Sequence, residues 1–229
     1  PHAATGAYER GDRTLDVETA TSLELTARYA SADVRFEASV YRARFDDFVA
    51  LIDSGLVWLE DDDEIVPAAR APAGEEALPV LDFRARDATF TGGEVVFGAT
   101  LGQWAGWDVR ADVAGSVVRA SFRGGGRVPR IPADSVTLGV DAERGAWFGR
   151  IEVEGLASQD RVAAGETETD GATVLNARLR WRPEGLRGAS LQLDGRNLTD
   201  EEVREHASFL KDVLPKPGRS VRLVVSADF

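Results

Sequence analysis

Hydrophobic and polar residues alternate along most of this chain with a period of two, which is typical of β-strands whose two faces meet different surroundings. The alternation is clearest in the last stretch, Gly218 to Phe229, where only Val224 breaks it. A final strand with one apolar face, one polar face and an aromatic last residue suits closure of a membrane-spanning β-barrel. An edge strand of a soluble β-sandwich has the same pattern, so this stretch alone leaves both architectures open.

The same alternation predicts eight further strands, which gives about nine in all. They cover residues 23–29, 34–52, 78–101, 107–117, 136–140, 147–156, 174–181 and 191–196. Short connections near residues 31, 104, 143 and 185 alternate with wide ones near residues 65, 126, 164 and 207. Short turns at one end and long loops at the other are typical of outer-membrane barrels, whereas Greek-key crossings seldom alternate so regularly. The pattern therefore favours an all-β fold, an antiparallel transmembrane β-barrel with meander topology.

Two of the wide connections have distinctive sequences. Residues Asp53 to Ala77 are rich in acidic residues, proline and glycine, which predicts a long acidic loop. Residues Asn197 to Pro217 contain a segment, Thr199 to Leu210, in which Thr199 and Glu202 have the spacing of a helix capping box. We expect a short helix there.

Four of the five tryptophans lie at or beside the predicted short turns, together with Tyr29. These are Trp104, Trp107, Trp147 and Trp181. In a barrel they form the aromatic girdle at the periplasmic membrane surface. The alternative, core tryptophans of a soluble domain, predicts no preference for one end.

The 229 residues are enough for one large all-β domain, and we treat 1–229 as one section of a barrel. A net charge of −12 argues against nucleic acid as a partner. The absence of cysteine excludes disulfides and thiolate chemistry. No apolar run approaches the roughly 18 residues of a spanning helix, so any membrane crossing has to use strands. The chain begins at Pro1 and contains no methionine, from which we expect a piece of something longer.

No sequence feature indicates an enzyme or a cofactor. Serine hydrolase, zinc protease and phosphate-loop motifs are missing, and Gly124 to Gly126 is not followed by the lysine of a phosphate loop. A catalytic triad would have to use His2 or His206, both of which lie in predicted loops.

The two histidines are candidate metal ligands instead. His206 lies near Glu201, Glu202, Glu205 and Asp212, and imidazole with carboxylate suits a divalent cation such as zinc. The alternative is solvated loop histidines, since no fixed ligand spacing is visible. The acidic residues Asp61, Asp62, Asp63 and Glu64, with Glu205, are candidates for loop residues that face the substrate. A run of this kind gathers cations at a pore mouth or is simply a solvated loop tip.

The tail from Asn197 to Phe229 resembles the C-terminus of TonB-dependent outer-membrane receptors. The shared features are an Asn-Leu-Thr-Asp motif at Asn197, a Pro-Gly-Arg motif at Pro217 and the terminal Phe229. Weaker similarities follow in the same order as in that family, at residues 1–6, 44–48, 86–94, 128–132 and 160–179.

This resemblance implies active uptake of a metal ion or metal chelate, such as a siderophore complex, across the outer membrane. Receptors of the family have roughly 22 strands around a plugged lumen. The chain is therefore expected to be the C-terminal section of the barrel, without the plug domain, the N-terminal strands or the segment that contacts TonB. The implied partners are outer-membrane lipid, the TonB energy-transducing complex and a metal or chelate ligand. Two alternatives stay open: a soluble β-sandwich, lectin-like binding module, and a passive pore or adhesin with fewer strands.

Overall fold

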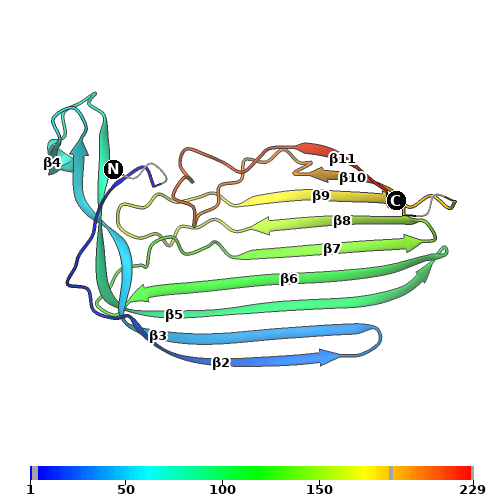
Figure 1. Ribbon diagram of the computed structural model, residues 1–229. Helices are drawn as coiled ribbons and strands as arrows, with labels where there is room; N and C mark the ends of the chain where they lie inside the picture. The colour runs from blue at the N-terminus through cyan, green and yellow to red at the C-terminus, as the bar shows by residue number, and fades with distance from the viewer. Residues whose placement is uncertain (2–4, 186–187, 228–229) are drawn as a thin grey trace.

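The computed structural model describes residues 1, 5–185 and 188–227. These residues form an antiparallel sheet in which nine strands follow one another as neighbours in chain order, and two short strands are added to it (Figure 1). The nine strands are β2 (Thr19–Ala30), β3 (Val34–Leu59), β5 (Ala77–Trp104), β6 (Trp107–Phe122), β7 (Ser135–Arg144), β8 (Trp147–Leu156), β9 (Ala172–Trp181), β10 (Ser190–Arg196) and β11 (Ser220–Ser226). The predicted all-β meander of about nine strands is confirmed.

The two short strands extend one corner of the sheet. β4 (Glu64–Pro67) pairs with the end of β3 and leads into a 3-10 turn, η1 (Ala68–Arg70). β1 (Tyr8–Arg10) pairs in parallel with β5 at Val80 to Asp82, where the β3 side of β5 is already occupied. β1 therefore lies along the edge of β5 that β6 leaves free beyond Ala88.

The side chains divide the sheet into an apolar face and a polar face. Leu23, Leu25, Val221 and Leu223 lie on the apolar face and are 77%, 72%, 64% and 65% exposed. They do not pack against a second sheet, although a soluble sandwich would bury them. Charged residues of the strands such as Glu37, Asp112 and Arg178 lie on the polar face, as the period of two requires.

Ion pairs connect the strands across the polar face. Arg150 on β8 reaches over β7 and binds the Asp112 carboxylate on β6 with two hydrogen bonds of 2.5 and 2.9 Å. Asp194 on β10 accepts from Arg178 on β9 and from Arg222 on β11, at 2.7 and 3.3 Å. Bidentate contacts of this kind fix geometry as well as neutralising charge.

A glycine makes the long reach of Arg150 possible. Gly139 on β7 faces Arg150, and a Cβ built at Gly139 would lie 2.1 Å from a guanidinium nitrogen of Arg150. Any larger residue would push the guanidinium away from Asp112.

The C-terminal end of β3 and the N-terminal end of β5 bend away from the direction of the other strands and rise toward β4 (Figure 1). The register of β3 shifts twice in this region, between Phe45 and Phe48 and between Asp53 and Leu56. Asp47 and Gly55, inside these bulges, have φ values of 57° and 72°. Bulges increase local twist and bend a strand, which explains the change of direction.

The main apolar core lies at this bend. It contains Ala50, Ala88, Ala120, Phe122 and Val128, and three phenylalanines, which contact one another edge to face, pack against it. These are Phe45, Phe48 and Phe90. Val128 comes from the β6–β7 loop, so this loop folds against the sheet.

Two sequence predictions are wrong at the long-loop end. The predicted acidic loop 53–77 is wrong in part, because residues 53–59 and 64–67 are strand and Leu56 to Leu59 pair on both sides, with β4 and with β5. The predicted helix Thr199 to Leu210 does not form. Asp200 has a left-handed φ of 59° in what would be the first turn, and the Thr199 hydroxyl donates to the Thr173 carbonyl of β9.

The predicted short turns and the tryptophans beside them are confirmed in position. Trp104 and Trp107 flank the turn between β5 and β6, while Trp147 opens β8 and Trp181 closes β9. Trp147 and Trp181 stack with ring centroids 5.7 Å apart. The terminal Phe229 lies outside the described residues.

We expect Gly139→Ala to weaken the sheet by up to about 1 kcal/mol, because the methyl group displaces Arg150 from Asp112 while Glu152 stays a partner of Arg150. The matched control is Gly98→Ala on β5, where an added Cβ has its nearest neighbour at 3.9 Å. Thermal unfolding of the full receptor in detergent measures both. Equal unfolding temperatures for the two variants would show that the Arg150 contact contributes nothing.

Candidate functional site

Three loops at one end of the sheet interlock to form what we call the loop layer, residues 123–134, 157–171 and 197–219. The amide of Arg130 donates to Glu166 Oε1 at 2.8 Å, which ties the first loop to the second. Lys211 Nζ donates to the Thr167 carbonyl at 2.7 Å and ties the second to the third. The Arg130 guanidinium also lies 3.9 Å from the ring centre of Phe209. The loops therefore form one packed layer.

Gln159 is the buried centre of this layer, with a side chain that is almost fully enclosed. Its Nε2 donates to the carbonyl oxygens of Ile131 and Pro132 at 3.0 and 3.1 Å. Its main chain pairs with Thr169 across the second loop. A buried amide that satisfies two carbonyls of a neighbouring loop fixes how the two loops meet.

His206 is buried in the same layer. Its Nδ1 lies 3.0 Å from Thr169 Oγ1, and its Nε2 lies 3.4 Å from Glu166 Oε1. Burial lowers the pKa of His206 below its ordinary value of 6.5, although Glu166 opposes the shift. Lys211 adds a positive charge that also lowers the pKa. His206 is therefore neutral at pH 7 and joins two loops.

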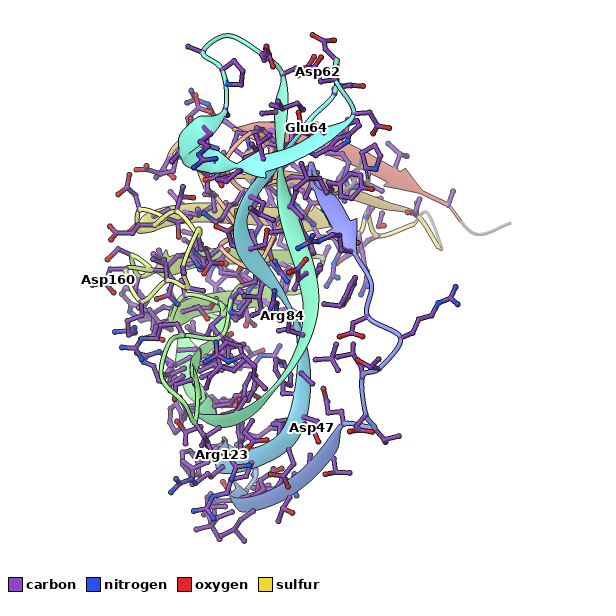
Figure 2. All side chains as sticks on the ribbon, turned by 90° about the vertical axis from the view of Figure 1, so that its left-hand side faces the viewer. Asp47, Asp62, Glu64, Arg84, Arg123 and Asp160 are labelled. Carbon is purple, nitrogen blue, oxygen red and sulfur yellow. The ribbon has the colours of Figure 1, made fainter. Side chains whose placement is uncertain are left out.

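The structure does not gather the predicted site residues in one place. Asp61, Asp62 and Asp63 lie in the exposed turn between β3 and β4, and Glu64 opens β4. Figure 2 shows Asp62 and Glu64 at the tip of the bent hairpin, away from Asp160 of the loop layer. Asp63 accepts a hydrogen bond of 2.9 Å from Trp58 Nε1, a partner that the sequence pattern did not indicate.

The carboxylate of Glu205 lies 3.9 Å from Lys216 Nζ, and His206 faces Glu166 from the neighbouring loop. His2 lies outside the described residues. Among the residues that are described, no group of three or more His, Cys, Asp or Glu side chains is arranged to hold a metal ion. A metal-binding role for His2 and His206 stays a prediction.

The bent hairpin reaches the loop layer. The Asp53 carboxylate packs so closely against Gly165 of the second loop that a Cβ at Gly165 would overlap it. At the base of the bend, Arg123 of the first loop pairs with Asp46 and with Asp87, the latter at 2.8 Å. Figure 2 shows Arg123 and Asp47 at this lower end of the hairpin. The loop layer and the hairpin thus cover the same end of the sheet.

A cavity of about 540 Å³ opens on the polar face beneath the third loop. It is lined by the charged residues Arg150, Glu152, Glu154, Arg178, Asp194, Arg196 and Lys216, together with Asn176 and Asn197. The sequence pattern did not indicate this cavity, because the cavity depends on the register of four strands and on the position of Lys216.

No helix in the described part of the chain is both long and apolar enough to span a membrane.

The family model for "TonB dependent receptor-like, beta-barrel" matches residues 2–198. Among solved structures, the chain is similar to the copper transporter OprC, with a TM-score of 0.73 and 20% identity over 95% of this chain and 33% of that one. For the FrpB iron transporter of Neisseria meningitidis the TM-score is 0.67 and the identity 15%, over 97% of this chain and 32% of that one. For the ferric yersiniabactin uptake receptor FyuA of Yersinia pestis the TM-score is 0.62 and the identity 20%, over 93% of this chain and 30% of that one. The chain thus spans about a third of each of these proteins, and the likeness shows the fold.

We expect Gln159→Ala to loosen the loop layer, since the carbonyls of Ile131 and Pro132 lose their donor at a cost of about 1–3 kcal/mol. Hydrogen exchange at residues 123–134 and 157–171 measures the effect. The control is Gln103→Ala, because Gln103 makes an exposed hydrogen bond with Asp108 at the short-turn end. Unchanged exchange in Gln159→Ala would contradict the role of Gln159.

Acidification should also loosen the loop layer. The pKa of His206 is lower in the folded layer than in the opened one, so the opened state takes up the proton first. The contribution of neutral His206 to the stability of the loop layer is complete above pH 6.5 and falls as the pH drops below that value. Hydrogen exchange at residues 157–171 and 197–219, compared at pH 7.5 and 5, measures this. His206→Gln should show a weaker pH dependence, and an identical dependence in both proteins would contradict the assignment.

Proposed function

Because this chain belongs to the TonB-dependent receptor-like β-barrel family, we propose that it is a section of an outer-membrane receptor that actively takes up a metal ion or metal chelate. The β-barrels of this family lie in the bacterial outer membrane, and its members are transporters rather than enzymes. The plug domain and the remaining strands would be supplied by parts of the receptor outside residues 1–229. Energy would come from the TonB complex through those parts.

The observation that supports this proposal most strongly is the division of the sheet into an exposed apolar face and a salt-bridged polar face. Hydrocarbon covers an apolar face of this kind without cost, and a water-filled lumen solvates the ion pairs of the other face. The soluble sandwich considered as an alternative is wrong for the described residues, since they form one sheet and leave Leu23 and Leu223 exposed. The net charge of −12 also disfavours nucleic acid as a partner.

The proposed substrate class rests on the relatives and on the charges at the long-loop end. OprC is named a copper transporter, FrpB an iron transporter and FyuA a ferric yersiniabactin uptake receptor. In this chain, the exposed carboxylates Asp61 to Glu64 and Glu205 would attract cations at the mouth. Arg196 and Lys216, which line the cavity on the polar face, would hold an anionic chelate.

Uptake by intact cells tests the proposal. The receptor, expressed with its full natural chain in a strain that lacks its own metal-chelate receptors, should accumulate radiolabelled iron, copper or zinc, supplied free or as an anionic chelate. Accumulation should disappear when the TonB gene is deleted. No accumulation of any of these substrates, or accumulation that does not depend on TonB, would contradict active uptake.

We expect Arg196→Gln and Lys216→Gln each to weaken binding of an anionic chelate roughly tenfold, because each removes one charge-assisted contact. The matched control is Arg70→Gln, an exposed arginine of η1 that is outside the cavity. Equilibrium titration of the chelate against purified receptor measures the affinities. The same affinity in all three variants would show that the cavity does not hold the ligand.

A further inference from the structure

A cluster of tryptophans and one arginine lies on the apolar face at the short-turn end. Register places Arg144 opposite Trp147 and Trp147 opposite Trp181, and Trp107 on β6 follows the same face. These side chains, with Glu184 of the following turn, line a cavity of about 610 Å³. The cavity therefore combines one cation, one anion and the stacked rings of Trp147 and Trp181.

A groove of about 530 Å³ lies beside this cavity on the apolar face. Small residues leave room for it, and larger apolar side chains enclose it. The small residues are Ala142, Gly149, Ala177 and Gly195, and the larger ones include Trp107, Ile151, Leu179, Leu193, Leu198 and Val221. Trp107 lines both spaces, so the polar cavity and the apolar groove are neighbours on the apolar face.

The charges of the cavity indicate what kind of molecule fits. Arg144 Nη1 donates to the Ala105 carbonyl at 3.3 Å, and a guanidinium has five N–H donors in all. Planar arginine is well suited to bind phosphate oxygens. Glu184 and the faces of Trp147 and Trp181 suit a primary ammonium group. One cation and one anion together match a zwitterion rather than a net anionic group.

We propose that the cavity and groove together form a binding site for one aminophospholipid of the periplasmic leaflet, with the phosphate at Arg144, the ammonium at Glu184 and an acyl chain in the groove. The inference rests on the proposed function, because it requires the apolar face to lie in the outer membrane with the short turns toward the periplasm. Interfacial tryptophans hold this part of the barrel at the level of the lipid headgroups.

Native mass spectrometry of the full receptor in detergent, titrated with defined lipids, tests the site. Phosphatidylethanolamine should be retained more tightly than phosphatidylglycerol or phosphatidylcholine, which lack the primary ammonium. Arg144→Gln should weaken retention of phosphatidylethanolamine roughly tenfold. Glu184→Gln should weaken phosphatidylethanolamine and leave phosphatidylglycerol unchanged. Soluble glycerophosphoethanolamine, which has no acyl chain, should not compete.

Two controls separate local effects from general ones. Arg70→Gln removes an arginine from the opposite end of the protein, and Ala27→Leu enlarges an exposed side chain of β2 outside the groove. Ala177→Leu should fill the groove and reduce retention, whereas Ala27→Leu should not. Heat-modifiable migration on gels confirms that each variant is folded, and Arg144→Lys replaces Arg144→Gln if the latter does not fold.

Equal retention of the three lipids by the unaltered receptor would overturn the proposal, and so would equal retention by the Arg144 variant and Arg70→Gln. An effect of Arg144→Gln without any effect of Glu184→Gln would overturn the choice of an aminophospholipid. The result is independent of transport: TonB-dependent uptake by a receptor that retains no lipid contradicts this site alone. Loss of uptake with lipid retention intact contradicts only the proposed function.

Discussion

The structure depends on the requirement that main-chain hydrogen-bonding groups be paired wherever water is excluded. In hydrocarbon an unpaired amide or carbonyl costs several kcal/mol, and the continuous ladder from β2 to β11 provides partners for all strands between them. The two outer strands, β2 and β11, each have one edge without a partner within the described residues. In the membrane these two edges need partners, either each other or strands outside this sheet.

The polar face is shaped by pairs of one large and one very small residue. Arg150 crosses β7 because Gly139 has no side chain, and the ring of Tyr41 lies where a Cβ of Gly92 would be. The first pair lets Arg150 lie across β7 and bind Asp112 two strands away. The ion pair between Arg150 and Asp112 therefore depends on Gly139 as well as on the two charged residues, although Gly139 bonds to neither side chain.

The sequence alone predicted the strands, their order and the end at which each connection lies, because a period of two and the spacing of turns are local properties. It failed where distant residues compete with local preference. Thr199 and Glu202 have the spacing of a helix cap, yet Thr199 bonds to β9 instead. The acidic composition of residues 53–77 indicated a loop, yet Leu56 to Leu59 form strand pairs on both sides. The contact of His206 with Glu166 joins two loops 40 residues apart, so the residues next to His206 in sequence gave no sign of it.

The parallel pairing of β1 has a mechanical consequence for the edge of the sheet. β1 lies beyond β5 while β2 lies beyond β3, so residues 11–18 cross both strands like a strap. Glu18 fastens the strap where it crosses, through a hydrogen bond of 2.9 Å from the amide of Val49. Sliding β2 by two residues along β3, about 7 Å, would carry Glu18 away from the Val49 amide and break this hydrogen bond. The strap therefore opposes a change of register in an edge strand that the described sheet holds from one side only.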